Sequence, residues 1–198
     1  MKSDDTLLLP ILEWPHPILR SPAQPIERFD QALTDRIEQM WHIMYHAPGI
    51  GLAAPQIADP RRLFVMDCGG RVSDPRPLVC ANPNIIRAEG ELDSTEGCLS
   101  FPELSVVVPR AASITLRAQD ELGTWFVIEL EGLEAVCAQH EIDHLEGRSF
   151  LDLLEPLERS ATLHSYIEGL RGSNTVTSQE TISRAEPLLA EYLMLALK

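Results

Sequence analysis

Two histidines with a glutamate between them form the pattern in this sequence that most directly suggests chemistry. His140 and His144 stand four residues apart. On a helix this spacing puts both imidazoles on one face, with Cβ atoms about 5–6 Å apart, so that both can hold one metal ion. Glu141 follows the first histidine and can reach a metal-bound water without binding the metal itself. This H-E-x-x-H arrangement is typical of metal hydrolases, in which the glutamate is the general base. The alternative is a surface helix that carries two unrelated histidines.

A third ligand is needed to complete such a site, and Cys98 is the candidate. It lies in the stretch Glu96-Gly97-Cys98-Leu99-Ser100, where the neighbouring glycine leaves it sterically open. On its own, this cysteine is a nucleophile, a metal ligand or a small buried hydrophobe. Because the histidine pair lacks a third ligand and thiolate suits borderline-soft divalent metals, we favour the role of ligand.

Composition limits the class of protein. The chain has 198 residues, 44% of them apolar, which suits one domain with a sizeable core. Its net charge of -14 argues against direct nucleic-acid binding and against docking to anionic membranes. None of the four cysteines forms a C-x-x-C pair, which fits a reducing compartment, and we find neither a signal peptide nor a membrane-spanning run. We therefore expect a cytoplasmic protein.

The elements that must position these residues can be predicted from apolar spacing. Residues 7–28 are rich in proline and predict an extended arm. Asp30 is a plausible helix N-cap, and a helix with one apolar face should run to about 47–49. Gly132 opens the histidine helix and Gly147 should end it. Strands are expected at about 63–66, 79–87, 105–109, 113–119 and 125–130, with a turn at 69–70. Further helix is expected from 152 to about 170 and, after a break at 172–175, in a final segment whose first turn holds Pro187.

Three motifs together resemble the peptide deformylase family. They are G-φ-G-φ-A-A-x-Q at 49–56, E-G-C-φ-S at 96–100 and Q-H-E-x-D-H at 139–144, all present in the family's order. The resemblance extends over about residues 7–158. It implies an α+β fold of mostly antiparallel β-sheets packed around a central metal-binding HExxH helix, with an N-terminal helix and C-terminal helices. Residues 1–158 would form the catalytic domain, and 159–198 a helical C-terminal extension of the same domain.

The resemblance also implies a mechanism. Cys98, His140 and His144 would hold one divalent metal with water as the fourth ligand. The family works best with Fe(II), which we expect in the cell, while Zn, Ni or Co are possible in preparations. Metal-bound hydroxide would attack the formyl group of an N-formyl-Met peptide chain, with Glu141 as general base and acid, and formate would be released. The Gln56 side-chain amide and the Leu99 backbone N–H would stabilise the oxyanion.

Further positions follow from the same resemblance. The residues that match Glu96 and Arg110 are paired in family members. The methionine side chain of the substrate would enter an apolar pocket, and two glycines would let the substrate backbone lie alongside in strand fashion. The residues implied in substrate binding are Gly49, Ile50, Gly51, Leu133, Val136 and Cys137.

Departures from the family pattern leave some properties open. Ser94 stands where many relatives carry a larger apolar residue, and Ser105 replaces a basic residue found in some bacterial members. The tail lacks a basic helix, so we expect at most weak association with the ribosome. Two other classes of function compete: a zincin-type endopeptidase, whose third ligand usually follows the helix, and a non-enzymatic protein that binds formylated peptides.

Overall fold

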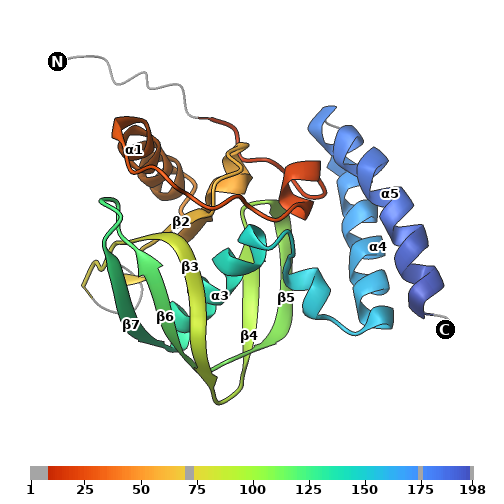
Figure 1. Cartoon of the computed structure of the whole chain (residues 1–198). Coiled ribbons are helices and arrows are strands. Elements are labelled where there is room, and N and C mark those ends of the chain that lie inside the picture. The colour runs from red at the N-terminus through yellow and green to blue at the C-terminus, as the bar shows by residue number, and fades with distance from the viewer. Residues whose placement is uncertain (1–8, 70–73, 174–175, 197–198) are drawn as a thin grey trace.

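Two antiparallel sheets surround one central helix, α3 (Gly132–Leu145), in the computed structural model of the chain (Figure 1). The structure describes residues 9–69, 74–173 and 176–196. A five-stranded sheet has the order β1-β2-β3-β6-β7, and β4 pairs with β5 in a separate hairpin. The strands are β1 (Gly51–Ala53), β2 (Leu63–Met66), β3 (Leu78–Glu89), β4 (Leu92–Cys98), β5 (Phe101–Arg110), β6 (Ser113–Gln119) and β7 (Trp125–Glu131). The predicted α+β class with mostly antiparallel sheets is therefore confirmed.

The sequence analysis did not predict two of the strands, the short β1 and the longer β4. In β4 the reason lies in its composition. Only its two end residues, Leu92 and Cys98, are apolar, and every other position is polar or glycine. Such a segment lacks the alternation of apolar and polar residues by which a half-buried strand is recognised. Cys98 is the last residue of this strand. The turn expected at 69–70 falls partly on Gly70, which lies outside the described residues.

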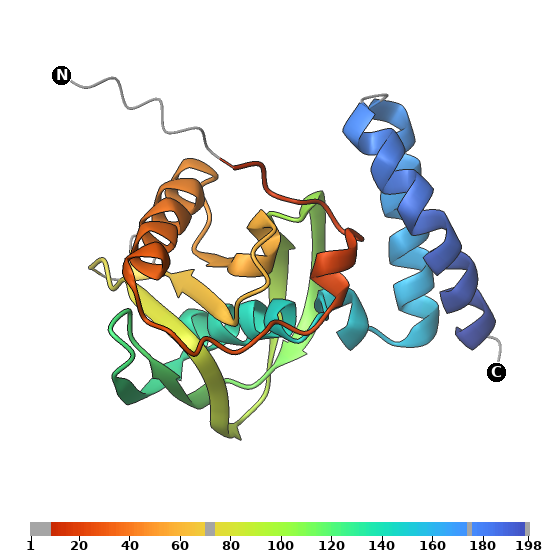
Figure 2. The same cartoon turned by 45° about the horizontal axis from the view of Figure 1, so that its top comes forward.

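The N-terminal segment is an arm followed by helix α1 (Gln31–His46) (Figure 2). The arm contains a short 3-10 helix, η1 (Pro17–Arg20). Asp30 caps α1 as predicted, since its side chain accepts a hydrogen bond of 3.2 Å from the Leu33 N–H. The apolar face of α1 is buried against β1 and β2. A second 3-10 helix, η2 (Ala54–Ile57), follows β1 directly.

Helix α3 ends where the sequence predicts. Gly147 follows the C-cap with a φ of 71°, in the left-handed region that glycine tolerates. A side chain there would also come within 2.8 Å of the Arg20 and Ser21 backbone of the arm. This glycine therefore both stops the helix and lets the arm pass close to its end.

The chain finishes in a helical hairpin that packs against the β4–β5 hairpin and the arm. After η3 (Phe150–Leu153) come α4 (Pro156–Ser173) and α5 (Val176–Ala196). Leu163, Ile167 and Leu188 are buried in the cluster that also holds Trp14, and a fully buried side chain of this size contributes about 1.5–3 kcal/mol. The expectation for Pro187 is wrong, because it lies well inside α5 rather than in its first turn. Pro187 has no N–H to donate to the carbonyl group one turn earlier in the helix. Because Pro187 is exposed, water can donate to that carbonyl instead.

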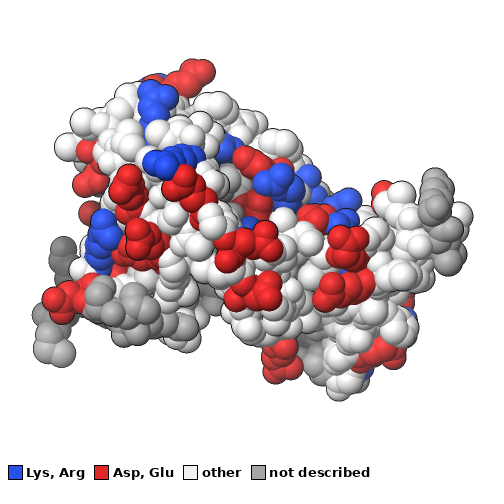
Figure 3. Space-filling view, turned by 90° about the horizontal axis from the view of Figure 1, so that it is seen from below, with Lys and Arg blue, Asp and Glu red and all other residues white. Residues whose placement is uncertain are grey.

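Charged side chains of both signs lie on the face shown in Figure 3. On the face in Figure 3, acidic side chains are spread widely and basic ones stand mostly beside them. Within the described part of the chain, no helix combines the length and the apolar character that crossing a membrane requires.

Candidate metal centre

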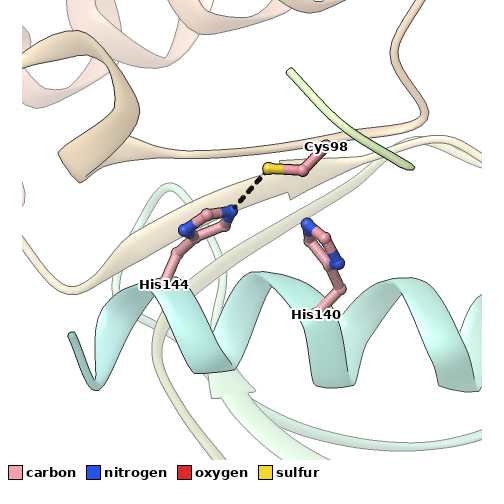
Figure 4. A group of neighbouring side chains, drawn as sticks. All are labelled: Cys98, His140 and His144. Carbon is pink, nitrogen blue, oxygen red and sulfur yellow. Dashed lines mark hydrogen bonds between the residues drawn. The ribbon is translucent and has the colours of Figure 1, made fainter. Parts of the chain in front are cut away.

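Three potential metal ligands converge from two elements. Cys98 comes from the end of β4, and His140 and His144 come from successive turns of α3 (Figure 4). One ligand atom from each lies within 4.8 Å of the other two. The Cys98 Sγ lies 3.2 Å from the His144 Nε2, and the two imidazole rings are 5.0 Å apart in an edge-to-face arrangement. Two imidazoles and a thiolate suit zinc, iron, nickel or cobalt, and three protein ligands leave one position open for chemistry.

Buried charges orient the first histidine. The Glu96 carboxylate lies 2.8 Å from the His140 Nδ1, which leaves Nε2 for a metal. Arg110 donates to both oxygens of Glu96, at 2.7 and 2.9 Å, and to Asp143 at 2.6 Å. The expected pair of Glu96 and Arg110 is thus present. Arg148, which the sequence analysis did not single out, donates to the other oxygen of Asp143 at 2.9 Å.

The two histidines differ in their protonation. Burial lowers the pKa of His144, and the neighbouring His140 and Arg110 charges lower it further, so this ring is neutral as a ligand must be. Burial also acts to lower the pKa of His140, but the Cys98 thiolate and Glu96 outweigh it and raise that pKa well above the usual value. A metal that bound the His140 ring would therefore have to displace a proton.

Glu141 is buried beside the ligands and has an unusual pKa. Burial raises the pKa of its carboxyl to about 7, against the opposing effect of His140. Its Oε2 has no hydrogen-bond partner among the described residues. Its Oε1 lies where a side chain on Gly51 would be, since a Cβ there would come within 2.3 Å. A carboxyl with this pKa can both accept and release a proton at neutral pH.

The Gln56 side chain is fixed with its amide group towards Cys98. Its Oε1 accepts a hydrogen bond of 2.8 Å from the Ala53 N–H. Its Nε2 lies 3.2 Å from the Ser100 Oγ and 3.8 Å from the Cys98 Sγ. Gln56 and Ser100 are both buried. The orientation of this amide is therefore set by hydrogen bonds at both ends, and its Nε2 faces the Ser100 hydroxyl and the Cys98 sulfur.

A cavity of about 460 Å³ opens beside the ligands. All six residues that the family resemblance implied in substrate binding line it: Gly49, Ile50, Gly51, Leu133, Val136 and Cys137. Gln56, Cys98, Leu99, His140 and Glu141 also line it. An apolar cavity with a few converging polar groups is the usual form of a small-ligand site.

The outer part of this cavity is polar. Ser94 and Ser105, the two departures from the family pattern, both line it, as does Glu103. Glu103 has a φ of 62°, which places a non-glycine residue in the left-handed region. The sequence analysis missed Glu103, because a glutamate gives no sign in the sequence that its backbone has a positive φ.

Comparison with known proteins agrees with the geometry. The family model described as "Polypeptide deformylase" matches residues 8–160. The chain is 41% identical over 157 residues to a peptide deformylase of Acidobacterium capsulatum, covering 79% of this chain and 92% of that protein. It is 45% identical over 157 residues to peptide deformylase 2 of Xanthomonas axonopodis pv. citri, with 77% and 90% covered. The chain belongs to the peptide deformylase family.

Solved structures support the same assignment. A crystal structure of a peptide deformylase from Legionella pneumophila superposes with a TM-score of 0.76 at 42% identity, covering 83% of this chain and 97% of that one. As a peptide deformylase, the protein is a hydrolase that removes the formyl group from nascent peptides. Peptide deformylases are metal enzymes, and the ligand cluster fits this requirement.

Proposed function

We propose that Cys98, His140 and His144 hold one divalent metal, Fe(II) in the cell, with Zn, Ni or Co able to replace it in preparations. Their convergence within 4.8 Å carries this proposal. The metal, when bound, lowers the pKa of a water molecule and polarises the formyl carbonyl. Glu96 supports the site by accepting a hydrogen bond from the His140 Nδ1–H, which fixes the ring with Nε2 towards the other two ligands.

Glu141 moves the proton. With a pKa of about 7 it is part ionised at neutral pH, so it can take a proton from the attacking water and deliver it to the leaving amine. Its burial and its position against Gly51 keep the carboxylate in one place. This role requires no rearrangement of the chain between the two transfers.

Two donors stabilise the negative oxygen that forms during attack. The Gln56 amide is oriented by its bonds to Ala53 and Ser100, and the Leu99 backbone N–H lies next to Cys98 in the chain. Losing one such donor typically costs about 3–4 kcal/mol of transition-state stabilisation. These donors act on the substrate oxygen and need no change in protonation.

The substrate is an N-formyl-Met peptide chain whose methionine side chain enters the apolar part of the cavity. Ile50, Leu133 and Val136 supply the wall, and Gly49 and Gly51 leave room for the peptide backbone. Ser94 and Ser105 make the outer part polar and are expected to tune the preference for the residues that follow methionine.

We propose further that residues 159–198 extend the catalytic domain 1–158 and bind the ribosome weakly at most. The extension shares a buried apolar cluster with the domain. Its arginines are neutralised locally, since Arg171 pairs with Glu168 and Glu186. Co-sedimentation with ribosomes at physiological salt would contradict the second point.

The activity is tested by measuring formate released from formyl-Met-Ala by protein reconstituted anaerobically with Fe(II). Acetyl-Met-Ala is the control substrate, and a Cys98→Ser variant is the control protein. We expect formate from the wild type alone, with one metal bound per chain and weaker binding in the variant. Absence of turnover in wild-type protein that holds one metal would reject the proposal.

A further inference from the structure

We propose that the C-terminal helical hairpin positions the oxyanion donors through a latch between Thr181 on α5 and Glu13 on the N-terminal arm. The Thr181 hydroxyl donates a hydrogen bond of 2.8 Å to the Glu13 carboxylate. The two residues are 168 positions apart in the chain. This inference rests on the proposed function, because it assigns the latch a role in the same reaction.

The arm bridges the two segments that carry the proposed donors. The Leu12 N–H donates to the Gln56 carbonyl at 2.8 Å, and the Trp14 N–H donates to the Ser100 carbonyl at 2.9 Å. These two bonds come from residues on either side of Glu13. The arm therefore spans from η2, which holds Gln56, to the β4–β5 turn, which holds Leu99, and helps to set the separation of the two donors.

The hairpin also holds the arm through packing. Trp14 is 3% exposed, and its ring stacks on Phe101 with centroids 5.1 Å apart. Phe101 in turn contacts Tyr166 of α4 at 5.6 Å. In Figures 1 and 2 the arm, coloured red, passes between the rest of the domain and the α4–α5 hairpin. Phe101 itself lines the cavity, so this contact reaches the site.

Burial makes the latch more than a surface contact. Thr181 is 2% exposed, so its hydroxyl must find a partner within the protein, and Glu13 is that partner. A hydrogen bond to a charged acceptor is stronger than a neutral one, and breaking it leaves a buried group unsatisfied. Both Tyr166 and Thr181 lie beyond residue 160, where the family model ends. The latch is thus a feature that the family motifs do not specify.

Variants of Thr181 distinguish a hairpin that only stabilises the fold from one that also positions the oxyanion donors. Thr181→Val keeps the shape and removes the hydroxyl, while Thr181→Ser keeps the hydroxyl. We expect kcat to fall about 5- to 20-fold in the valine variant, less than the roughly 10²- to 10³-fold loss of a whole oxyanion donor. KM should stay within about twofold, because the groups moved act on the transition state rather than on bound substrate. The serine variant should regain most of the loss.

The matched control is Ser160→Ala. Ser160 is also buried in the hairpin, and its hydroxyl donates to the Pro156 carbonyl of its own helix at 2.9 Å, away from the arm. It should lose stability without loss of kcat. Glu13→Ala removes the other partner of the latch, which is the more exposed of the two. It should lower kcat as Thr181→Val does, so the proposal can still be tested if the valine variant unfolds.

A double-mutant cycle tests the route. If the latch acts through Gln56, Thr181→Val should cost less in a Gln56→Ala background than in the wild type. The latch is rejected if wild-type protein releases formate and Thr181→Val and Glu13→Ala both keep kcat within twofold of Ser160→Ala. Equal costs in both backgrounds would reject the route through Gln56. Failure of the wild type to release formate would instead reject the proposed function.

Discussion

Gly51→Ala should slow turnover strongly while the protein still folds. A Cβ at this position would lie 2.3 Å from the Glu141 Oε1 and 2.8 Å from both the Glu141 Cδ and the Cys137 Sγ. Reaching the 3.4 Å of an ordinary contact from 2.3 Å requires a shift of 1.1 Å. The displaced atom belongs to the Glu141 carboxylate, which is buried and which we propose carries the proton.

The size of the effect follows from this displacement. A misplacement of about 1 Å in a catalytic group can cost about 10²-fold in rate, which corresponds to about 2.7 kcal/mol of activation free energy. Overpacking a tight site by one methyl group typically destabilises a protein by about 1–3 kcal/mol. Metal binding should be retained, because none of the three atoms nearest to a Cβ on Gly51 belongs to Cys98, His140 or His144.

The assay is formate release from formyl-Met-Ala by protein loaded with Fe(II), together with metal content and thermal unfolding. Gly169→Ala is the matched control, since a Cβ there meets nothing within 4 Å inside helix α4. It should leave turnover unchanged and stabilise the helix slightly. A Gly51→Ala variant with wild-type turnover would refute the argument that this glycine makes room for the Glu141 carboxylate.

Three further results are expected. Glu96→Gln should weaken metal affinity about 10- to 100-fold, measured by competition with a chelator, because it loosens the orientation of His140; unchanged affinity would count against this role. Ser105→Arg should raise kcat/KM for formyl-Met peptides with an acidic residue after methionine relative to basic ones, since none of the described residues that line the cavity is Lys or Arg. An unchanged ratio would place Ser105 outside the substrate path. Burial acts to raise the pKa of the Asp59 carboxyl. Arg61 and Arg36 outweigh this effect and hold the pKa below its usual value. The stabilisation by the Asp59 carboxylate is therefore present above about pH 4 and is lost as the pH falls through the lower pKa of the folded state. Asp59→Asn should flatten the acid side of the curve of Tm against pH. An unchanged curve would contradict this prediction.

Local patterns in the sequence predicted much of the fold and the gathering of the ligands. The spacing of His140 and His144 works because one helix carries both, and the caps at Asp30 and Gly147 are local signals. The histidine pair needs a third ligand, and the resemblance to the family indicates the same residue, Cys98, for that position.

Such local patterns could not predict the contacts between segments that are distant in the sequence. Strand β4 has too few apolar residues to be recognised, and Arg148 joins the charges behind His140 only because the chain turns back after Gly147. The bonds from Leu12 and Trp14 to η2 and the β4–β5 turn involve backbone groups, which carry no mark in the sequence. Pro187 suggested a helix start that the packing of α5 overrides.

The most direct test of the account is turnover by Glu141→Gln at matched metal occupancy. Glutamine keeps the size of the side chain and removes its ability to accept a proton. With one Fe(II) bound per chain in both proteins, we expect wild-type protein to release formate from formyl-Met-Ala and the variant to be slower by about 10²- to 10⁴-fold. A fully loaded variant that retains turnover within tenfold of the wild type would show that Glu141 does not carry the proton.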